Sequence, residues 1–423
     1  MIQTRMIEKV LQTGTPAFVF DERDFQDRFG QIDEILNGNM EKGSANRICL
    51  CYAAKANPFL LTAASKVADR LEICSQGEMD IVHELSLDGE MVLYSGVSKT
   101  LTDIRKAISQ GMRYATAESL THLALLQQAA EEAGAALTVL LRLNSGAQFG
   151  MKRADIEKAL AERQNYSALQ IEGIHYFCGT QRRKLKQQED ELLMLEGLVQ
   201  ALRKKYGLAL PKLEYGPGLP VPYFEGEDFD DTLLPIKSLA PALQRAAGWA
   251  EVTVEMGRFF AAPCGTYLTA VTDLKETDDA NIVILDGGIH QLTYAGQMMG
   301  MKIPKMYVVS QDDGCISDQT TIPKQNTVVG SGKRNYMLCG SLCTTGDVLV
   351  RDVELPVLQI GDVLAFENVG AYTVTEGIGL FLSHELPAVY LYDSDRTDEE
   401  LMLARASMPT SVLNSIQKYF FTV

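Results

Sequence analysis

Residues 47–58 read RICLCYAAKANP, a short apolar run followed at once by a lysine, an asparagine and a proline. A run of this length, bounded by a turn signal, predicts a buried strand over residues 47–53. Similar runs follow: LEIC (71–74), MVLYS (91–95), RYATA (113–117), ALTVLLRL (136–143), LQIEGIHY (169–176), KLEYG (212–216) and EVTVEM (251–256). Helical patterns lie between them, so strands and helices alternate as far as residue 258.

Strict alternation predicts a parallel sheet, because parallel strands need a crossover helix between them. The helical patterns include SLTHLALLQQAAEEAG (119–134), which ends in a glycine stop, and RRKLKQQEDELLMLEGLVQALRKKYG (182–207). About eight strand–helix repeats in roughly 200 residues favour a closed (β/α)8 barrel of the TIM type. A doubly wound open sheet is the alternative that the alternation alone leaves open.

The character of the chain changes after about residue 259, where helical periodicity fades. Runs such as CGTYLTAVTDL (264–274), ANIVILDGG (280–288) and DVLAFEN (362–368) are separated by Gly, Pro and Asp turns and predict an antiparallel β domain. The run AFVFDE (17–22) is a further strand that could pair into that domain. We therefore expect a barrel over residues 27–258 and a β-rich domain made of residues 1–26 and 259–423.

Composition excludes several classes of protein. The chain has 423 residues, and 39 Lys and Arg against 55 Asp and Glu give a net charge of −16. That sign repels phosphate backbones and anionic membrane surfaces, so neither nucleic acid nor a membrane is an expected partner. No apolar run reaches about 18 residues, and the N-terminus has no apolar signal core, so a cytosolic location is expected.

Cysteine and histidine usage is consistent with an intracellular protein that has no catalytic metal. The cysteines contain no CxxC pair, the spacing of zinc and redox sites. Apart from Cys343, they are expected to be reduced structural thiols: Cys49, Cys51, Cys74, Cys178, Cys264, Cys315 and Cys339. Five scattered histidines without an acidic cluster argue against a catalytic metal.

Polar residues gather at the C-terminal ends of the predicted barrel strands, where the chemistry of such barrels lies. They are Lys55, Ser75, Ser95, Glu118, Arg142, His175, the GPGLP turn (216–220) and Glu255. Among the histidines, His175 is the best placed for chemistry.

Several residues at these strand ends have a chemical interpretation of their own. Lys55 is expected to point into the barrel mouth, where partial burial lowers a lysine pKa and frees a neutral amine for a Schiff base. Gly216 and Gly218 could let backbone N–H groups approach a phosphate. Glu255 could hold a cationic ring nitrogen, and Arg258 could clamp a phosphate. The plain alternatives are a surface lysine, an ordinary Gly-Pro turn and a surface ion pair.

Two further candidates lie in polar loops of the expected β domain. Cys343 in GSLCTTGDVL, four residues before Asp347, could serve as an acid near pH 8, and the alternative is a buried thiol. Tyr372 in NVGAYTVT could donate its hydroxyl to a phosphate, although on its own it would more often be a packing tyrosine.

Taken together, these strings resemble one family, the fold-type III pyridoxal-phosphate decarboxylases, which include diaminopimelate and ornithine decarboxylases. The resemblance covers roughly residues 15–395. The matching strings are YAAKAN (52–57), EICSQGE (72–78), GIHYFCGTQ (173–181), GPGLP (216–220), EMGR (255–258), LCTTGD (342–347) and GAY (370–372). Any one of them is weak, whereas all of them in register along the chain are specific.

The resemblance implies a role for each matched position. Lys55 would bind pyridoxal 5′-phosphate as a Schiff base, and Glu255 would keep its pyridine nitrogen protonated. Cys343 would reprotonate the carbanion left by carbon dioxide. In this family Cys343 and Asp347 come from the neighbouring subunit, which implies a homodimer. The implied cofactor-binding set is Lys55, His175, Phe177, Thr180, Gly216, Gly218, Glu255, Arg258 and Tyr372.

Departures from the family pattern bear on the substrate. In diaminopimelate decarboxylases the sixth-strand motif reads HxHIGS, and its second histidine, which stacks on the ring, is Phe177 here. The family's Cys-Glu pair is Cys343–Thr344, and IHQLTYAGQMMG (289–300) lacks the arginine that meets the distal carboxylate. Free diaminopimelate is therefore a poor fit.

The same departures resemble decarboxylases of specialised biosynthesis, including a butirosin-pathway enzyme that acts on a glutamyl group carried by an acyl carrier protein. The expected reaction is α-decarboxylation of an amino-acid group that is derivatised or tethered to such a carrier. The alternatives are a diaminopimelate decarboxylase of lysine biosynthesis, an amino-acid racemase of the same fold, and a non-enzymatic cofactor-binding protein.

Overall fold

The computed structural model describes residues 4–227, 229, 231–309, 316–317, 332–395 and 401–416. The chain divides into two compact units. One consists of Met1–Phe25, Pro222–Asp228 and Ala261–Val423, and the other of Gln26–Val221 and Phe229–Phe260. Cys315, expected to be a structural thiol, lies outside the described residues.

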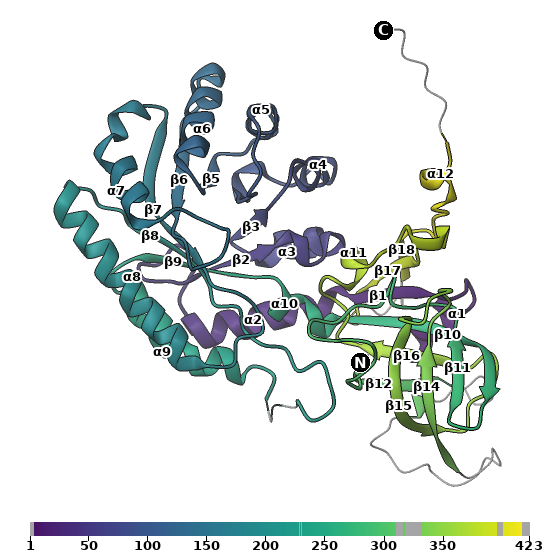
Figure 1. Cartoon of the computed structure of the whole chain (residues 1–423). Coiled ribbons are helices and arrows are strands. Elements are labelled where there is room, and N and C mark those ends of the chain that lie inside the picture. Colours follow the sequence, from purple (N-terminus) through teal and green to yellow (C-terminus); the bar gives the residue numbers. More distant parts are fainter. Residues whose placement is uncertain are drawn as a thin grey trace. The chain divides into compact units, whose positions relative to one another are not determined.

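The second unit is a closed barrel of parallel strands (Figure 1). Its strands are β2 (Cys49–Ala53), β3 (Arg70–Ile73), β4 (Val92–Tyr94), β5 (Tyr114–Ala117), β6 (Leu137–Arg142), β7 (Leu169–Phe177), β8 (Lys212–Gly216) and β9 (Glu251–Met256). Each pairs in parallel with the next along the chain. β9 then pairs with β2, so the ring is closed. This closure confirms the predicted (β/α)8 barrel and excludes the open sheet.

Helices precede, connect and follow the barrel strands. They are α2 (Glu22–Asn37), α3 (Leu61–Val67), α4 (Gln76–Glu84), α5 (Leu101–Ser109), α6 (Leu120–Ala133), α7 (Arg153–Ala161), α8 (Leu185–Tyr206), α9 (Leu234–Ala247) and α10 (Arg258–Ala261). Among the described residues, no helix is both long and apolar enough to cross a membrane.

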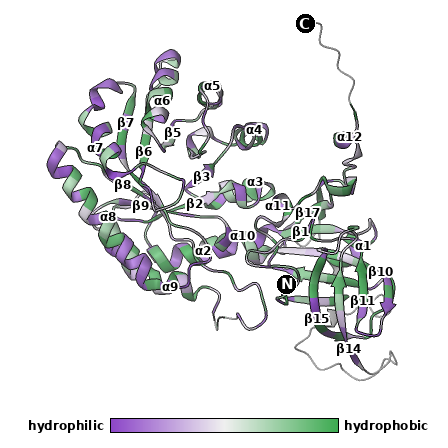
Figure 2. Ribbon diagram, viewed as in Figure 1, coloured by the Kyte–Doolittle hydropathy of each residue, from purple (hydrophilic) through white to green (hydrophobic). Residues whose placement is uncertain are grey.

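Local sequence explains where α6 begins and where α6 and α8 end. The Ser119 hydroxyl accepts the His122 N–H at 3.1 Å and caps the start of α6. α6 and α8 end at Gly134 and Gly207, whose φ angles of 60° and 63° lie in the left-handed region that glycine adopts without strain. In Figure 2 both hydrophobic and hydrophilic residues colour α8, because only one of its faces is buried.

The other unit is a β domain. Its elements are α1 (Thr4–Leu11), β1 (Ala17–Asp21), β10 (Gly265–Glu276), β11 (Asn281–Leu285), β12 (Met306–Val309), β13 (Ile316–Ser317), β14 (Lys333–Cys339), β15 (Val348–Pro356), β16 (Val363–Glu367), α11 (Thr373–Glu376), β17 (Ala388–Tyr392), β18 (Leu401–Arg405) and α12 (Ser411–Asn414). The described strands follow the order β13-β12-β16-β10-β1-β17-β18, and β11, β14 and β15 extend the sheet from β10.

Most of these pairings are antiparallel, as predicted, but the sheet is mixed. β1 pairs antiparallel with β10 and parallel with β17, so the AFVFDE strand does pair into the β domain. β11 and β14 are also parallel. The inner strand β1 is buried along its whole length, which matches its unbroken apolar sequence.

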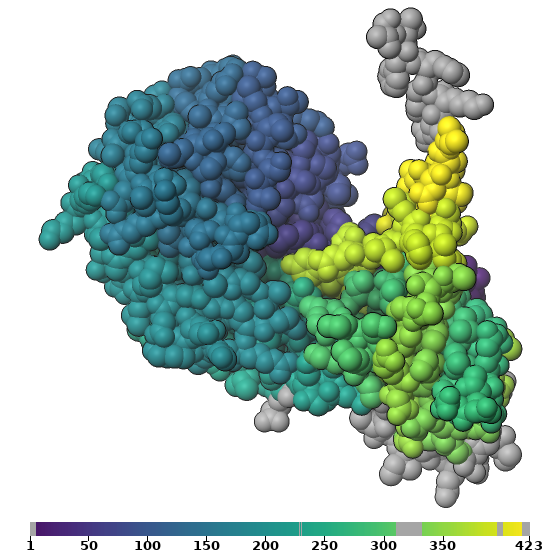
Figure 3. Space-filling model, in the orientation of Figure 1, coloured from purple at the N-terminus to yellow at the C-terminus, as the bar shows by residue number. Residues whose placement is uncertain are grey.

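The last described segment, residues 401–416, packs on the loop that precedes β17. Asn414 Nδ2 donates to the Leu380 carbonyl at 2.7 Å and to Ser383 Oγ at 2.9 Å. Leu386 and Met408 form a two-residue antiparallel bridge. In Figure 3 the yellow atoms of this segment accordingly continue from the yellow-green residues before them.

Replacing Leu140 with alanine should weaken the barrel. Leu140 is fully buried on β6 and packs with Leu93 and Tyr114. Truncating a core leucine costs about 2–5 kcal/mol, because a cavity remains. We expect a lower urea midpoint, followed by the fluorescence of Trp249, the single tryptophan of the chain. The control is Leu193→Ala on α8, which is 59% exposed and should leave the midpoint nearly unchanged. Equal midpoints for the two variants would contradict the packing described here.

Candidate active site

Lys55 lies just beyond β2, in a single 3-10 turn (Ala54–Ala56) at the C-terminal end of the strand. Its Nζ donates to Oε2 of Glu72 at 2.6 Å and approaches Sγ of Cys74 at 3.4 Å. The Glu72 side chain on β3 is only 3% exposed, whereas that of Lys55 is 39% exposed. The amine therefore points to a carboxylate inside the barrel mouth. The sequence argument expected burial to free a neutral amine, and the structure instead gives Lys55 an ion-pair partner.

Glu72 and Cys74 are site residues that the sequence argument did not single out, since Cys74 was expected to be only a structural thiol. The Cys74 thiol donates to Oε1 of Glu72 at 2.9 Å, and the Cys74 N–H donates to Oε2 of Glu78 at 2.6 Å. Burial, reinforced by Glu72, raises the pKa of the Cys74 thiol well above its usual value, so the thiol keeps its proton. The signal in the sequence that could have identified Glu72 is a glutamate between two apolar residues of the strand RLEI.

Glu255, at the end of β9, is paired with His175 of β7. His175 Nε2 donates to Oε2 of Glu255 at 2.9 Å, and both side chains are buried. Burial alone would raise the pKa of Glu255. The hydrogen bond and charge of His175, together with Lys55 and Arg142, outweigh burial and lower it. Glu255 is therefore a buried anion that faces the interior of the barrel.

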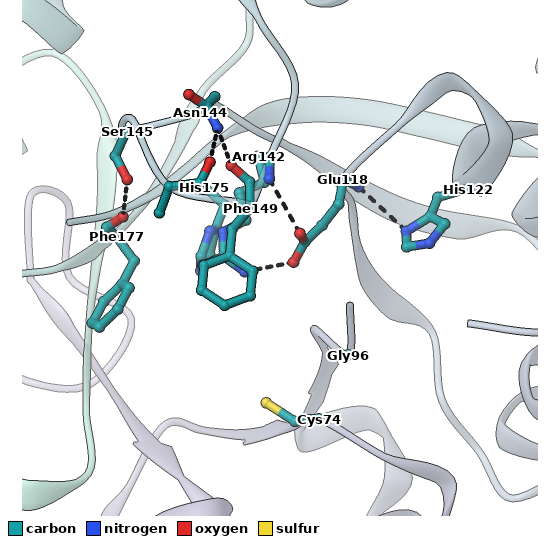
Figure 4. A network of polar contacts seen from close by, with 12 residues as sticks. Cys74, Gly96, Glu118, His122, Arg142, Asn144, Ser145, Phe149, His175 and Phe177 are labelled. Carbon is teal, nitrogen blue, oxygen red and sulfur yellow. Dashed lines mark hydrogen bonds and ion pairs between the residues drawn. The ribbon is translucent and has the colours of Figure 1, made fainter. Parts of the chain in front are cut away.

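A second buried ion pair joins Arg142, at the end of β6, to Glu118, which follows β5. Figure 4 shows Glu118 between Arg142 and His122, whose Nδ1 accepts the Glu118 N–H. Oε2 of Glu118 also accepts the Gly150 N–H at 3.1 Å, and the Phe149 ring lies 4.8 Å from the Arg142 guanidinium carbon. The loop after β6 is thus held, through Phe149 and Gly150, against Arg142 and Glu118 at the ends of β6 and β5.

Lys99, beyond β4, is a further buried cation that the sequence did not indicate. Its Nζ donates to the Gly96 carbonyl and lies 5.6 Å from the centre of the Tyr94 ring. Burial lowers its pKa to about 8, although Glu118 opposes that effect. Of the two serines predicted at strand ends, Ser75 accepts the Glu78 N–H at 3.1 Å and caps α4, and Ser95 is buried.

The predicted phosphate-binding residues converge beside β7 and β8. Arg258 Nε donates to the Thr180 hydroxyl at 3.3 Å, and the Arg182 N–H donates to the Gly218 carbonyl at 2.9 Å. Gly218 has a φ of 61°, and a Cβ there would lie 2.0 Å from the Gly179 carbonyl oxygen. This close approach requires glycine. A Cβ on Gly216 would lie 2.5 Å from the ring of Phe177, which places that ring against the turn.

Cys343, Asp347 and Tyr372 lie in loops of the β domain. Cys343 is exposed. Asp347 is buried, and its two oxygens accept the N–H groups of Ile289 and Leu342, both at 2.8 Å. Burial raises the pKa of Asp347, and those two hydrogen bonds oppose the rise. Asp347 therefore ties the loop after β11 to the loop of Cys343. Tyr372 precedes α11 with a φ of 69°, a rare conformation for a bulky side chain that is often found at functional sites.

The barrel residues fit pyridoxal phosphate on three counts. Lys55 offers an amine at the mouth, Glu255 offers a buried anion to a ring nitrogen, and the close-packed glycine turn at Gly218 lies beside Gly179, next to the Thr180 hydroxyl and Arg258. Oxygen acceptors and cationic donors are thus placed for the two polar ends of that molecule.

Comparisons with known proteins agree with this fit. A sequence model of the family described as "Pyridoxal-dependent decarboxylase, pyridoxal binding domain" matches residues 30–262. The chain is 24% identical over 397 residues to L-glutamyl-[BtrI acyl-carrier protein] decarboxylase of Niallia circulans, covering 88% of this chain and 87% of that protein. It is 27% identical over 377 residues to diaminopimelate decarboxylase of Pseudomonas aeruginosa, covering 85% and 83%.

A solved structure shares the fold. Diaminopimelate decarboxylase of Methanocaldococcus jannaschii, in complex with L-lysine, superposes with a TM-score of 0.81 at 22% identity, covering 98% of this chain and 94% of that one. The family model spans more than half of the sequence. The chain therefore belongs to the pyridoxal-dependent decarboxylases, a family of amino-acid decarboxylases that use pyridoxal phosphate.

Proposed function

We propose that this chain decarboxylates the α-carboxylate of an amino-acid group with pyridoxal phosphate bound through Lys55. The observation that carries the proposal is the Lys55 amine, 2.6 Å from the buried Glu72, in the barrel that also holds the buried Glu255–His175 pair. When bound, pyridoxal phosphate supplies an electron sink for the electron pair left when carbon dioxide departs.

Within the barrel, Glu255 holds a proton at the ring nitrogen of the cofactor. Its lowered pKa keeps it anionic, and His175 fixes its orientation through the 2.9 Å hydrogen bond. Phe177 offers an aromatic face for the ring. Thr180, Arg258 and Gly216–Gly218 would bind the phosphate, and the resemblance to the family assigns Tyr372 to the same group.

Cys343 is the acid that returns a proton to Cα, and its exposed thiol suits that role. Asp347 acts as a positioning residue, because its carboxylate is occupied by two backbone N–H groups of the same loop system. Following the family pattern, Cys343 serves the active site of a second copy of the chain.

An exposed apolar surface of the β domain supports a homodimer. Ile378, Leu380, Phe381, Leu413 and Ile416 form this C-terminal apolar patch, and each is at least 44% exposed. The hydrogen bond from Asn414 to the Leu380 carbonyl brings the two segments together. A group of exposed apolar side chains on neighbouring segments supports an interaction site.

The substrate is an amino-acid group whose distal end is derivatised or attached to an acyl carrier protein, as in the Niallia circulans relative. The stretch 289–300 contains no arginine, and Thr344 stands where diaminopimelate decarboxylases place a glutamate. A tethered substrate presents no free distal charge, so it needs neither partner.

One observation favours diaminopimelate as a second candidate substrate. Arg351 of β15 donates its Nε–H to the Met299 carbonyl at 2.9 Å, so a guanidinium does lie beside this loop. A decarboxylase that acts on free diaminopimelate could use the Arg351 guanidinium to bind the distal carboxylate of the substrate.

Replacing Lys55 with alanine should abolish the visible absorbance of bound cofactor, because no amine remains at the end of β2 to bond with the aldehyde. The absorbance spectrum after gel filtration measures this. Lys237→Ala on α9, which removes an exposed lysine of the same unit, is the matched control and should keep the band. A band that survives in the Lys55 variant would refute the assignment.

Replacing Cys343 with alanine should leave the cofactor bound while turnover falls about 100-fold or more, the usual contribution of a general acid. The measurements are cofactor absorbance and the rate of carbon dioxide release. Cys339→Ala, in the neighbouring strand β14, is the matched control. Near-normal turnover of the Cys343 variant would remove this thiol from the chemistry.

The same variants test the shared site. If Lys55 and Cys343 from different subunits meet, mixing the two inactive variants at equal amounts should restore about a quarter of the wild-type activity, because half of the dimers are mixed and each has one intact site. No recovery, despite subunit exchange verified by differently tagged chains, would place both residues in one subunit.

Free diaminopimelate should be decarboxylated at least about tenfold more slowly than a glutamyl group linked through its γ-carboxyl to a carrier thiol, since the loop lacks both charged partners. Carbon dioxide release from the two substrates at equal concentration measures the ratio. Faster release from free diaminopimelate would reverse the substrate assignment in favour of the second candidate.

A further inference from the structure

We propose that Glu72 is a catalytic residue of this site, whose task is to hold a proton on Nζ of Lys55. The inference rests on the role of Lys55 given above and deepens it. Oε2 of Glu72 lies 2.6 Å from Nζ, and the carboxylate is buried at the end of β3, next to the turn that carries Lys55. Glu72 opens the matched string EICSQGE, but neither that match nor the strand-end rule gave its side chain a role.

The surroundings of Glu72 favour an anion paired with an ammonium. A buried carboxylate is costly unless it is paired and hydrogen-bonded. The Cys74 thiol donates to Oε1, which leaves Oε2 facing the lysine. Because burial keeps the thiol protonated, Cys74 is a steady donor and does not add a second anion. Both oxygens of Glu72 are thus used, one by a neutral donor and one by the Lys55 amine.

Other charged groups face the pair from the neighbouring elements. Glu78 of α4 interacts with both Glu72 and Lys55, and burial raises its pKa. Glu255 of β9 is an anion whose pKa is lowered in part by the charge of Lys55. Lys99, beyond β4, lies within electrostatic range of Glu72. Arg142 of β6 acts on Glu255 in the same way as Lys55 does.

Two further titratable groups complete these surroundings. His175 of β7 donates to Glu255, and Glu214 of β8 is a fully buried carboxyl whose pKa burial raises to about 8. Glu72 is the carboxylate whose oxygen lies 2.6 Å from Nζ, and its charge is placed to hold a proton on this nitrogen.

Holding that proton has a chemical consequence. A cationic nitrogen draws electrons from the carbon to which it is bonded, so that carbon is more open to attack by a substrate amine. When Lys55 is displaced, the same carboxylate stabilises its ammonium form. Glu72 thereby keeps Lys55 from competing with the substrate as a neutral nucleophile.

The test is the titration of Lys55 in Glu72→Gln, which keeps the shape of the side chain and removes its charge. The cofactor is stripped from the full chain, lysines are labelled by reductive methylation with carbon-13, and the Lys55 signal is identified by its absence in Lys55→Ala. The midpoint of its pH titration should fall by at least about one unit, a tenfold loss of proton affinity. Glu72→Asp should restore part of the shift.

Glu214→Gln is the matched control, because it removes the ionisable carboxyl of another buried barrel residue, on β8, which β9 separates from the strand before Lys55. Its Lys55 midpoint should stay within about 0.3 unit of the wild type. In the loaded protein, the pH at which the visible cofactor band is lost should fall in Glu72→Gln and stay in place in Glu214→Gln.

An unchanged or raised Lys55 midpoint in Glu72→Gln overturns the proposal. Should that variant fail to fold, a wild-type midpoint well below about 10.4, the value of an ordinary lysine, overturns it as well. Failure of the function proposed above looks different, because cofactor absorbance would then persist in Lys55→Ala. A bound cofactor that depends on Lys55 but is indifferent to Glu72 refutes only the inference.

Discussion

The parallel pairing of β9 with β2 is the constraint on which the site depends. It sets Glu255 opposite Cys51 and Met256 opposite Tyr52, three residues before Lys55. Groups some 200 residues apart in sequence thereby reach the same mouth of the barrel. The turn after β9 must then pack against the turn that carries Lys55. A Cβ at Gly257 would lie 2.7 Å from the Cβ of Ala56, so only glycine fits between the two strand ends.

Charge balance explains how a barrel interior can hold so many ionisable groups. Lys55 pairs with Glu72, Arg142 with Glu118, and His175 with Glu255. In the first two pairs the partners come from neighbouring strands, and the third spans β8. Glu214 on β8 has its pKa raised to about 8 by burial and by Glu255, so it is protonated at neutral pH. The strand between those of the third pair thus carries a neutral carboxyl, and Glu255 remains the anion there.

The barrel and several residues at its mouth could be predicted from the sequence, because both follow from local patterns. The runs KLEYG and EVTVEM became β8 and β9 with the predicted bounds, and the rule of strand ends led to Lys55, His175 and Glu255. Glu72 and Lys99 were not predicted as site residues, because their roles depend on contacts between strands and on burial. No local sequence pattern reveals either. β14 and β15 were also not singled out, since KRNYMLC and VLVRDVELP mix charged and apolar residues on a half-exposed sheet.

The two units carry different parts of the proposed chemistry, and the fold does not by itself specify the substrate. The buried pairs that suit the cofactor all lie in the barrel, whereas Cys343 and Thr344 lie in a loop of the β domain. Asp347 stabilises that loop by accepting the N–H groups of Ile289 and Leu342. The backbone of the loop is therefore held by contacts that do not involve the exposed side chains. Those side chains can therefore change without disturbing either the loop or the barrel. Relatives can therefore share the fold and differ at these exposed positions, where the function proposed above places the choice of substrate.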